Sequence, residues 1–153
     1  MRTAIVGRRL DPCALLAEVA NAANGASVLF VGTVRNVNDD VPVSGLDYTA
    51  YNAMAERELG AIVREAVQRW KTSDIVVEHR IGALDLGEAS VAIAAAHPHR
   101  GEAFEASRYI IEELKKRLPI WKREHYVDGR SEWVAAGSAK REEGSGLKAR
   151  ALP

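Results

Sequence analysis

The residues best suited to chemistry are a group of cations between positions 115 and 123. Five of these nine positions are basic, namely Lys115, Lys116, Arg117, Lys122 and Arg123. Cations near a helix end also interact favourably with the helix dipole, so a charge run alone is usually structural. Here Pro119 interrupts the run, and a turn at this proline would let Lys115 and Lys122 converge. Desolvated lysines beside other cations lose protons more readily, which suits nucleophilic or general-base catalysis.

A second candidate is the stretch His97-Pro98-His99-Arg100, between a predicted strand and a predicted helix. The free N–H groups of a helix start and a bidentate arginine are suited to binding phosphate. A helix start with incidental charges is the ordinary alternative. His97 and His99 do not indicate a metal site, because no third ligand is evident. Arg35, at the end of another predicted strand, is a third candidate anion-binding residue.

Several classes of function lack their usual signals in this sequence. There is no GxxxxGK[ST], GxGxxG, GxSxG or CxxC pattern. The single cysteine, Cys13, excludes an internal disulfide and a cysteine-based metal site. We expect Cys13 to be a small buried residue, with a reactive thiol at a helix start as the alternative. The 21 basic and 21 acidic residues give zero net charge, which argues against general nucleic-acid binding.

The hydrophobic pattern predicts the elements that position these residues. Helices are expected at 11–23, 53–71 and 101–118, and strands at 26–34, 43–51, 74–81, 90–97 and 120–127. Residues 35–42 and 82–88 have the composition of turns. Met54 and Phe104 are expected on the buried sides of their helices. The order of elements predicts an α+β (mixed α/β) domain in which hairpins are commoner than crossovers.

Composition also predicts one domain over residues 1–136 and a loosely ordered C-terminal tail over 137–153, which is small, charged and glycine-rich. No apolar run approaches the ~20 residues that a membrane span needs. The first residues have no apolar segment typical of a signal peptide. The expected location is therefore the cytoplasm.

Five blocks in this order resemble the large subunit of molybdopterin synthase: FVGTVRN (30–36), LDYTAYNAMAEREL (46–59), HRIGALDLGEASV (79–91), HRGEAF (99–104) and LKKRLPIWKRE (114–124). The resemblance implies an α/β hammerhead fold with an additional antiparallel β-sheet, working as a homodimer. The motif search leads us to expect no metal and no cofactor. The resemblance also implies a small ubiquitin-like sulfur carrier, whose C-terminal Gly-Gly thiocarboxylate enters each active site, giving a heterotetramer. The implied reaction adds two sulfurs to cyclic pyranopterin monophosphate and produces molybdopterin.

The resemblance also implies roles for individual residues. Lys115 and Lys122 match the two active-site lysines, and Arg35, His99 and Arg100 match contacts to the substrate's phosphate and pterin. Four further positions are expected to line the same pocket: Thr33, Val34, Arg123 and Glu124. In this family the pocket is completed at the dimer interface, so some contacts are expected to cross protomers. The alternatives are a binding module for RNA or a phosphorylated metabolite, which uses the same basic cluster without chemistry, and an inactive scaffold subunit. The sequence leaves open which lysine attacks.

Overall fold

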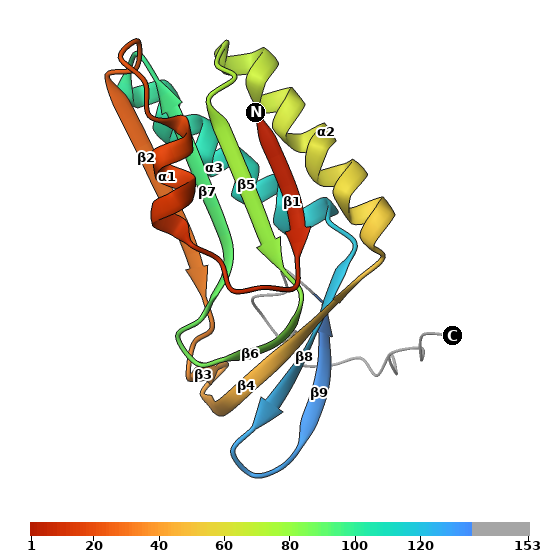
Figure 1. Cartoon of the computed structure of the whole chain (residues 1–153). Coiled ribbons are helices and arrows are strands. Elements are labelled where there is room, and N and C mark those ends of the chain that lie inside the picture. The colour runs from red at the N-terminus through yellow and green to blue at the C-terminus, as the bar shows by residue number, and fades with distance from the viewer. Residues whose placement is uncertain (136–153) are drawn as a thin grey trace.

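The chain folds into two β-sheets, and the helices pack mainly against the first of them (Figure 1). The structure is a computed structural model, and it describes residues 1–135. The elements in chain order are β1 (Arg2–Val6), α1 (Pro12–Val19), β2 (Ala26–Thr33), β3 (Val37–Asn38), β4 (Val41–Ala50), α2 (Asn52–Trp70), β5 (Ile75–Arg80), β6 (Gly82–Asp85), β7 (Ala89–His97), α3 (Arg100–Arg117), β8 (Ile120–Tyr126) and β9 (Ser131–Ala135).

The first sheet has the strand order β1-β5-β7-β2 and helices on both faces. β1 and β5 are parallel, whereas β7 pairs antiparallel with β5 and with β2. Alternate residues of β7 enter two cores: Val91, Ile93 and Ala95 pack with α2 and α3, and Ala92, Ala94 and Ala96 pack with α1. Because successive strand residues point to opposite faces, one strand serves both cores. The small alanines let α1 lie close to the sheet (Figure 1).

The second sheet has the order β3-β4-β8-β9, and β6 pairs with β4. β4 and β8 are antiparallel, with Val43 opposite Tyr126 at one end and Ala50 opposite Ile120 at the other. A small core of Val34, Leu46 and Leu84 lies beneath β4. This core joins the end of the first sheet to the start of the second.

The connection from α3 to β8 determines where the basic residues lie. α3 ends at Arg117, and Leu118 is extended with φ −71° and ψ 124°. A residue before proline is restricted to extended conformations, so Pro119 ends the helix as the sequence predicts. β8 begins at Ile120, which places Lys122 on a strand that starts directly after the helix carrying Lys115.

The predicted fold class is confirmed, and most predicted elements agree with the structure within two residues. The helix predicted at 11–23 is shorter, because it ends at Val19. Its predicted start is confirmed, since the Asp11 side chain accepts a hydrogen bond from the Ala14 amide at 3.0 Å. The pattern missed β1, β3, β6 and β9, four strands of two to five residues. The predicted tail at 137–153 lies outside the described residues.

Three residues expected in buried positions are exposed. Met54 is 50% exposed and Phe104 is 62% exposed. Each lies one position, about 100° of helical rotation, from a buried alanine that faces the core. Cys13 is also exposed, because α1 packs on the sheet through Leu15 and Val19 instead. Within residues 1–135 we find no helix long and apolar enough to cross a membrane.

Candidate active site

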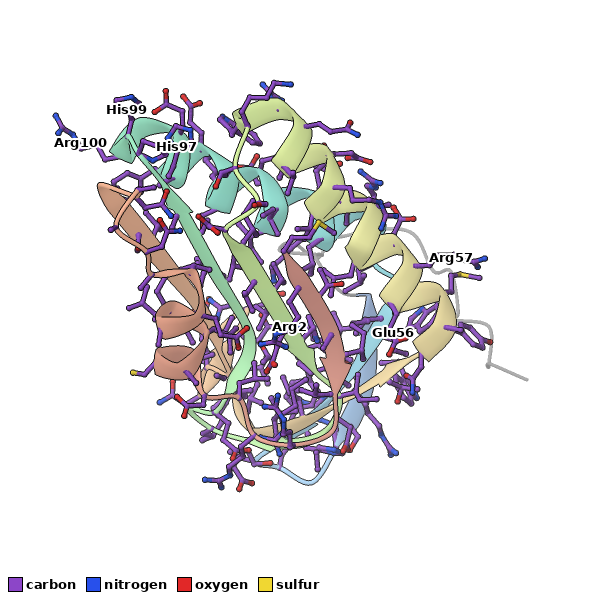
Figure 2. The ribbon with its side chains drawn as sticks, turned by 45° about the horizontal axis from the view of Figure 1, so that its top comes forward. Arg2, Glu56, Arg57, His97, His99 and Arg100 are labelled. Carbon is purple, nitrogen blue, oxygen red and sulfur yellow. The ribbon has the colours of Figure 1, made fainter. Side chains whose placement is uncertain are left out.

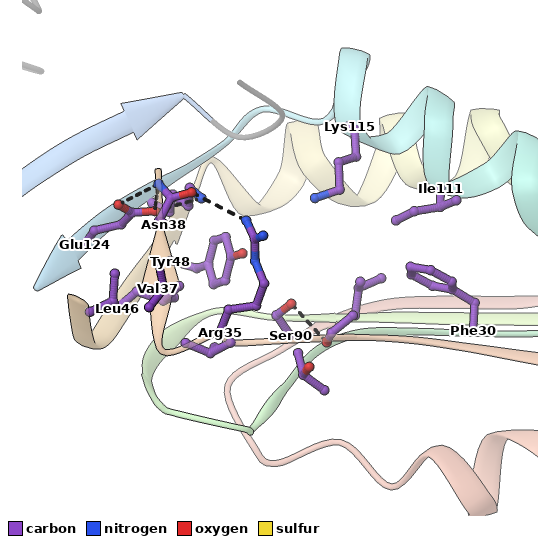
Figure 3. Close-up of a pocket in the computed structure, with 16 residues that line it drawn as sticks. Phe30, Arg35, Val37, Asn38, Leu46, Tyr48, Ser90, Ile111, Lys115 and Glu124 are labelled. Atoms are coloured by element: carbon purple, nitrogen blue, oxygen red, sulfur yellow. Dashed lines mark hydrogen bonds and ion pairs between the residues drawn. The ribbon is translucent and has the colours of Figure 1, made fainter. Parts of the chain in front are cut away.

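A pocket of about 130 Å³ lies where the two sheets meet under the last turns of α3 (Figure 3). Six of the residues singled out in the sequence line it: Thr33, Val34, Arg35, Lys115, Lys122 and Glu124. They come from the end of β2, from α3 and from β8. The pocket therefore contains three cations and one carboxylate among these residues, which suits an anionic ligand.

Lys115 and Lys122 converge as the turn at Pro119 predicts. Both line this pocket and a smaller adjoining cavity of about 40 Å³. Although Lys115 is exposed as a residue, partial loss of water around its ammonium lowers its pKa from the ordinary value, and repulsion from Lys122 and Arg35 lowers it further. Within residues 1–135, no carboxylate lies within ion-pair distance of Lys115. The surroundings of Lys115 thus favour loss of its proton.

Lys122 lies beside a buried carboxylate. Its Nζ is 2.9 Å from Oε1 of Glu124, which is only 2% exposed. Asn38 Nδ2 donates to both oxygens of Glu124 at 2.9 and 3.0 Å, and the Tyr126 hydroxyl donates to Oε2 at 3.0 Å. Burial acts to raise the pKa of Glu124, but the hydrogen bonds from Lys122 and Asn38 outweigh it, so this pKa lies below its ordinary value. The ionised carboxylate holds Lys122 in place as a cation.

The smaller cavity has His79 in its wall. His79 is 5% exposed, and its Nδ1 lies 2.9 Å from the carbonyl oxygen of Arg80. Since that carbonyl can only accept, Nδ1 carries the proton and Nε2 is the unprotonated nitrogen. Burial lowers the pKa of His79 to about 4, so the ring is neutral near pH 7. It packs edge-on against Tyr48, with ring centroids 5.1 Å apart.

His99 and Arg100 lie far from this pocket in the same chain. They stand at the start of α3, beside His97, at the end of the first sheet (Figure 2). Lys115 lies fifteen positions after Arg100 on α3, a distance of about 22 Å at the helical rise of about 1.5 Å per residue. One chain alone therefore does not bring these two candidate residues to the lysines.

His97 explains how the turn before α3 is held. Its buried ring has Nε2 at 3.0 Å from the Trp70 carbonyl oxygen, while Nδ1 accepts the His99 amide N–H at 2.9 Å. The Trp70 carbonyl oxygen accepts a hydrogen bond from Nε2 and the His99 amide donates one to Nδ1, so both ring nitrogens have a hydrogen-bond partner. His97 therefore orients the backbone that carries His99 and Arg100.

Arg123 is the one candidate on β8 that the structure does not place in the pocket. Because successive strand residues point to opposite faces, Lys122 and Glu124 both face the pocket. Arg123 points to the other face, where it is exposed. Arg123 therefore does not line the pocket of its own chain, and its expected contact with the substrate stays a prediction.

Residues that sequence reasoning missed also line the pocket, above all Asn38, Tyr48 and Ser90. Asn38 lies in the segment expected to be a turn, where asparagine is common. Its contact with Glu124 spans 86 positions of sequence, so no local signal indicates it. Within residues 1–135, no group of three His, Cys, Asp or Glu side chains is arranged to hold a metal ion.

Comparisons with known proteins agree with this geometry. The chain is 41% identical over 124 residues to the "Molybdopterin synthase catalytic subunit" of Emericella nidulans; the match covers 81% of this chain and 64% of that protein. It therefore spans slightly less than two thirds of that relative's length. The crystal structure of molybdopterin synthase from Staphylococcus aureus is similar with a TM-score of 0.80 at 37% identity, covering 86% of this chain and 95% of that one.

A more distant structure has the same fold. It is a protein–protein complex of subunits 1 and 2 of the molybdopterin-converting factor from Helicobacter pylori, with a TM-score of 0.68 at 24% identity, covering 89% of this chain and 90% of that one. The family model described as "MoaE protein" matches residues 5–117, which include β2, Arg35 and the whole of α3. Because this match covers well over half of the sequence, the chain belongs to the MoaE protein family.

Proposed function

We propose that this chain is the catalytic subunit of a molybdopterin synthase. In this proposal it transfers sulfur from the C-terminal thiocarboxylate of a small ubiquitin-like carrier to cyclic pyranopterin monophosphate, and two such transfers give molybdopterin. The observation that carries the proposal is the convergence of Lys115, Lys122 and Arg35 in one pocket of a family member. The names of the relatives in Emericella nidulans and Staphylococcus aureus support the same reaction.

The surroundings of the two lysines suggest different roles. Lys115 has a lowered pKa and no acidic partner within residues 1–135, so it supplies the neutral amine, as nucleophile or general base. Lys122 is paired with Glu124, so it supplies a fixed positive charge near the reacting groups. Arg35 at the mouth of the pocket is suited to bind the phosphate of the substrate. Thr33 and Val34 would form the adjoining wall.

The active assembly is proposed to be a homodimer with one carrier on each subunit. The Helicobacter pylori complex of two subunits supports a carrier partner, because one chain of that complex has the same fold as this chain. His99 and Arg100 are about 22 Å along α3 from Lys115, so they cannot serve their own pocket. They are instead proposed to enter the pocket of the partner subunit, where they would contact the substrate.

Reconstitution tests the reaction directly. The chain is mixed with thiocarboxylated carrier and cyclic pyranopterin monophosphate, and oxidised molybdopterin is measured by fluorescence. Replacing Lys115 or Lys122 by alanine should reduce the rate by about 100-fold or more, the usual contribution of a positioned acid–base group. Lys116→Ala is the matched control, because Lys116 pairs with Glu113 and does not line the main pocket. Wild-type rates in both pocket variants would remove the assigned roles.

A mixed-dimer experiment tests the exchange between subunits. Lys115→Ala and Arg100→Ala chains should each be nearly inactive alone. A dimer that contains one of each has one pocket with an intact Lys115 and an intact Arg100 from the partner. Mixing should therefore restore up to about half of the wild-type activity, and no recovery in dimers shown to be mixed would contradict the shared pocket.

The alternative function has a distinct outcome. If the chain binds the carrier but yields no product, a non-catalytic subunit or a phosphometabolite-binding module becomes the better reading. Tight binding of RNA with a steep dependence on salt would favour a nucleic-acid-binding module instead.

A further inference from the structure

Asn38 is hydrogen-bonded to two charged groups of the pocket, Arg35 and Glu124 (Figure 3). Glu124 in turn pairs with Lys122. Asn38 Nδ2 donates to both oxygens of Glu124, and Asn38 Oδ1 accepts a longer hydrogen bond of 3.4 Å from Arg35 Nη2. The orientation of the amide follows from its partners, because a carboxylate can only accept and a guanidinium can only donate. Asn38 thus forms a neutral bridge between a cation and an anion.

The position of Asn38 is determined by a tight turn. Asn38 pairs with Val41 at the end of the β3–β4 hairpin, and Asp39 and Asp40 form the two-residue loop. Both aspartates are left-handed, with φ of 46° and 61°. Two consecutive residues with positive φ match the twist of a two-residue hairpin loop, and aspartate tolerates this conformation better than most residues. The hairpin therefore presents the Asn38 amide toward Glu124 in one defined place.

The side chain at position 38 has to be neutral if Arg35 is to bind an anion and Lys122 is to keep Glu124 as its partner. If Glu124 paired with Arg35, the positive charge of Arg35 would be neutralised and Lys122 would lose its partner. The amide of Asn38 instead donates to the carboxylate and accepts from Arg35 without adding charge. Glu124 is left to hold Lys122, and Arg35 is left to bind an anion.

We propose that Asn38 is a positioning residue that reserves Glu124 for Lys122 and keeps Arg35 available for the anionic part of the substrate. The inference rests on the proposed function for its effect on turnover, but its effect on anion binding is independent of the reaction. Asn38 touches neither reacting group in this scheme, so its role is exerted through its two charged neighbours.

Two variants of Asn38 should have different effects. Asn38→Asp places a carboxylate beside Arg35 and against Glu124, so it should weaken binding of inorganic phosphate and raise KM by about tenfold or more. Asn38→Ala removes one donor to Glu124 without adding charge. Lys122 and the Tyr126 hydroxyl still hold the carboxylate, so Arg35 should stay free to bind phosphate with an affinity within about twofold of wild type, while kcat falls by about tenfold. Asn36→Ala is the matched control: Asn36 is exposed in the same loop, and the hydrogen bond from the Val43 amide goes to its backbone oxygen.

The experiment measures phosphate binding by calorimetry, then kcat and KM in the reconstituted assay, with circular dichroism to verify folding. The inference is supported if Asn38→Asp loses phosphate affinity while Asn38→Ala keeps it and loses kcat. A merely structural residue would lower phosphate affinity and kcat alike in both variants. Equal losses in the two variants, or wild-type phosphate affinity in Asn38→Asp, would overturn it. If the wild-type chain gives no product, the proposed function fails, and the phosphate titration alone still decides for or against the role of Asn38.

Discussion

The buried neutral imidazole of His79 should make the folded chain sensitive to mild acid. Its pKa is about 4 in the folded chain against an ordinary value of 6.5, chiefly because burial disfavours the charged ring. The unfolded chain therefore binds more protons than the folded chain between these two values. A lowered histidine pKa gives stability that is fully present above pH 6.5 and is lost as the pH falls toward 4.

The magnitude follows from the gap between the two pKa values. Each pKa unit corresponds to about 1.4 kcal/mol, so the complete loss is about 3 kcal/mol. About 2 kcal/mol of this should already be lost at pH 5. Carboxylates with pKa values below the ordinary 4.5, such as Glu124 and Glu78, lose their contribution to stability mainly as the pH falls below about 4.5, so most of the His79 window lies above theirs. The acid sensitivity of His79 can therefore be measured with little interference from them.

The assay is urea unfolding at several pH values between 7.5 and 5, followed by tryptophan fluorescence. His79→Asn keeps an N–H donor close to the position of Nδ1, which can still reach the Arg80 carbonyl, but it does not titrate. His79→Phe keeps a ring against Tyr48 and also does not titrate. Both variants should lose stability at pH 7.5, yet each should show about 2 kcal/mol less additional loss by pH 5 than the wild type. Identical pH dependence in all three chains would refute the assignment of a buried neutral ring.

Two further predictions concern stability away from the pocket. Gly25→Ala should lower the melting temperature, because the added Cβ would lie 2.5 Å from the Pro98 carbonyl oxygen. Displacing this turn costs roughly 1–3 kcal/mol. An unchanged melting temperature would show that the turn moves freely. Arg117→Ala should cost about 1–2 kcal/mol, because Arg117 joins α3 to α2 through Glu58 at 2.6 Å and Glu65 at 2.7 Å, and these half-exposed pairs are partly screened. Urea unfolding in low and high salt checks the second prediction, since the difference between the two chains should shrink at high salt.

The sequence by itself determined the helices that carry the site and the convergence of the two lysines. Both depend on local properties: helical periodicity in residues 101–118, and the inability of Pro119 to continue a helix. A turn of two residues between a helix and a strand leaves few possible arrangements, so Lys115 and Lys122 had to lie near each other. The order of elements likewise predicted a mixed α/β domain, which the two sheets confirm.

Two of the short strands could not be predicted, because their partners are distant in the sequence. β1 pairs with β5 more than 70 positions away, and β6 pairs with β4 with Gly45 opposite Asp85, whereas β3 and β9 form hairpins with the neighbouring strands β4 and β8. Five-residue segments of this kind carry too few alternating positions to distinguish a strand from a loop. Their pairing is decided by the surface that the rest of the fold offers.

Only the tertiary structure decided which side chains share the pocket. The register of β4 and β8 directs Glu124 inward and Arg123 outward, and the β3–β4 hairpin brings Asn38 to a carboxylate 86 positions away. The length of α3 separates Arg100 from Lys115 within one chain. These relations depend on strand alternation and on long-range packing, in which a shift of one residue reverses the direction of every side chain. Residue types and spacing therefore indicated the chemistry, while the fold determined which groups can act together.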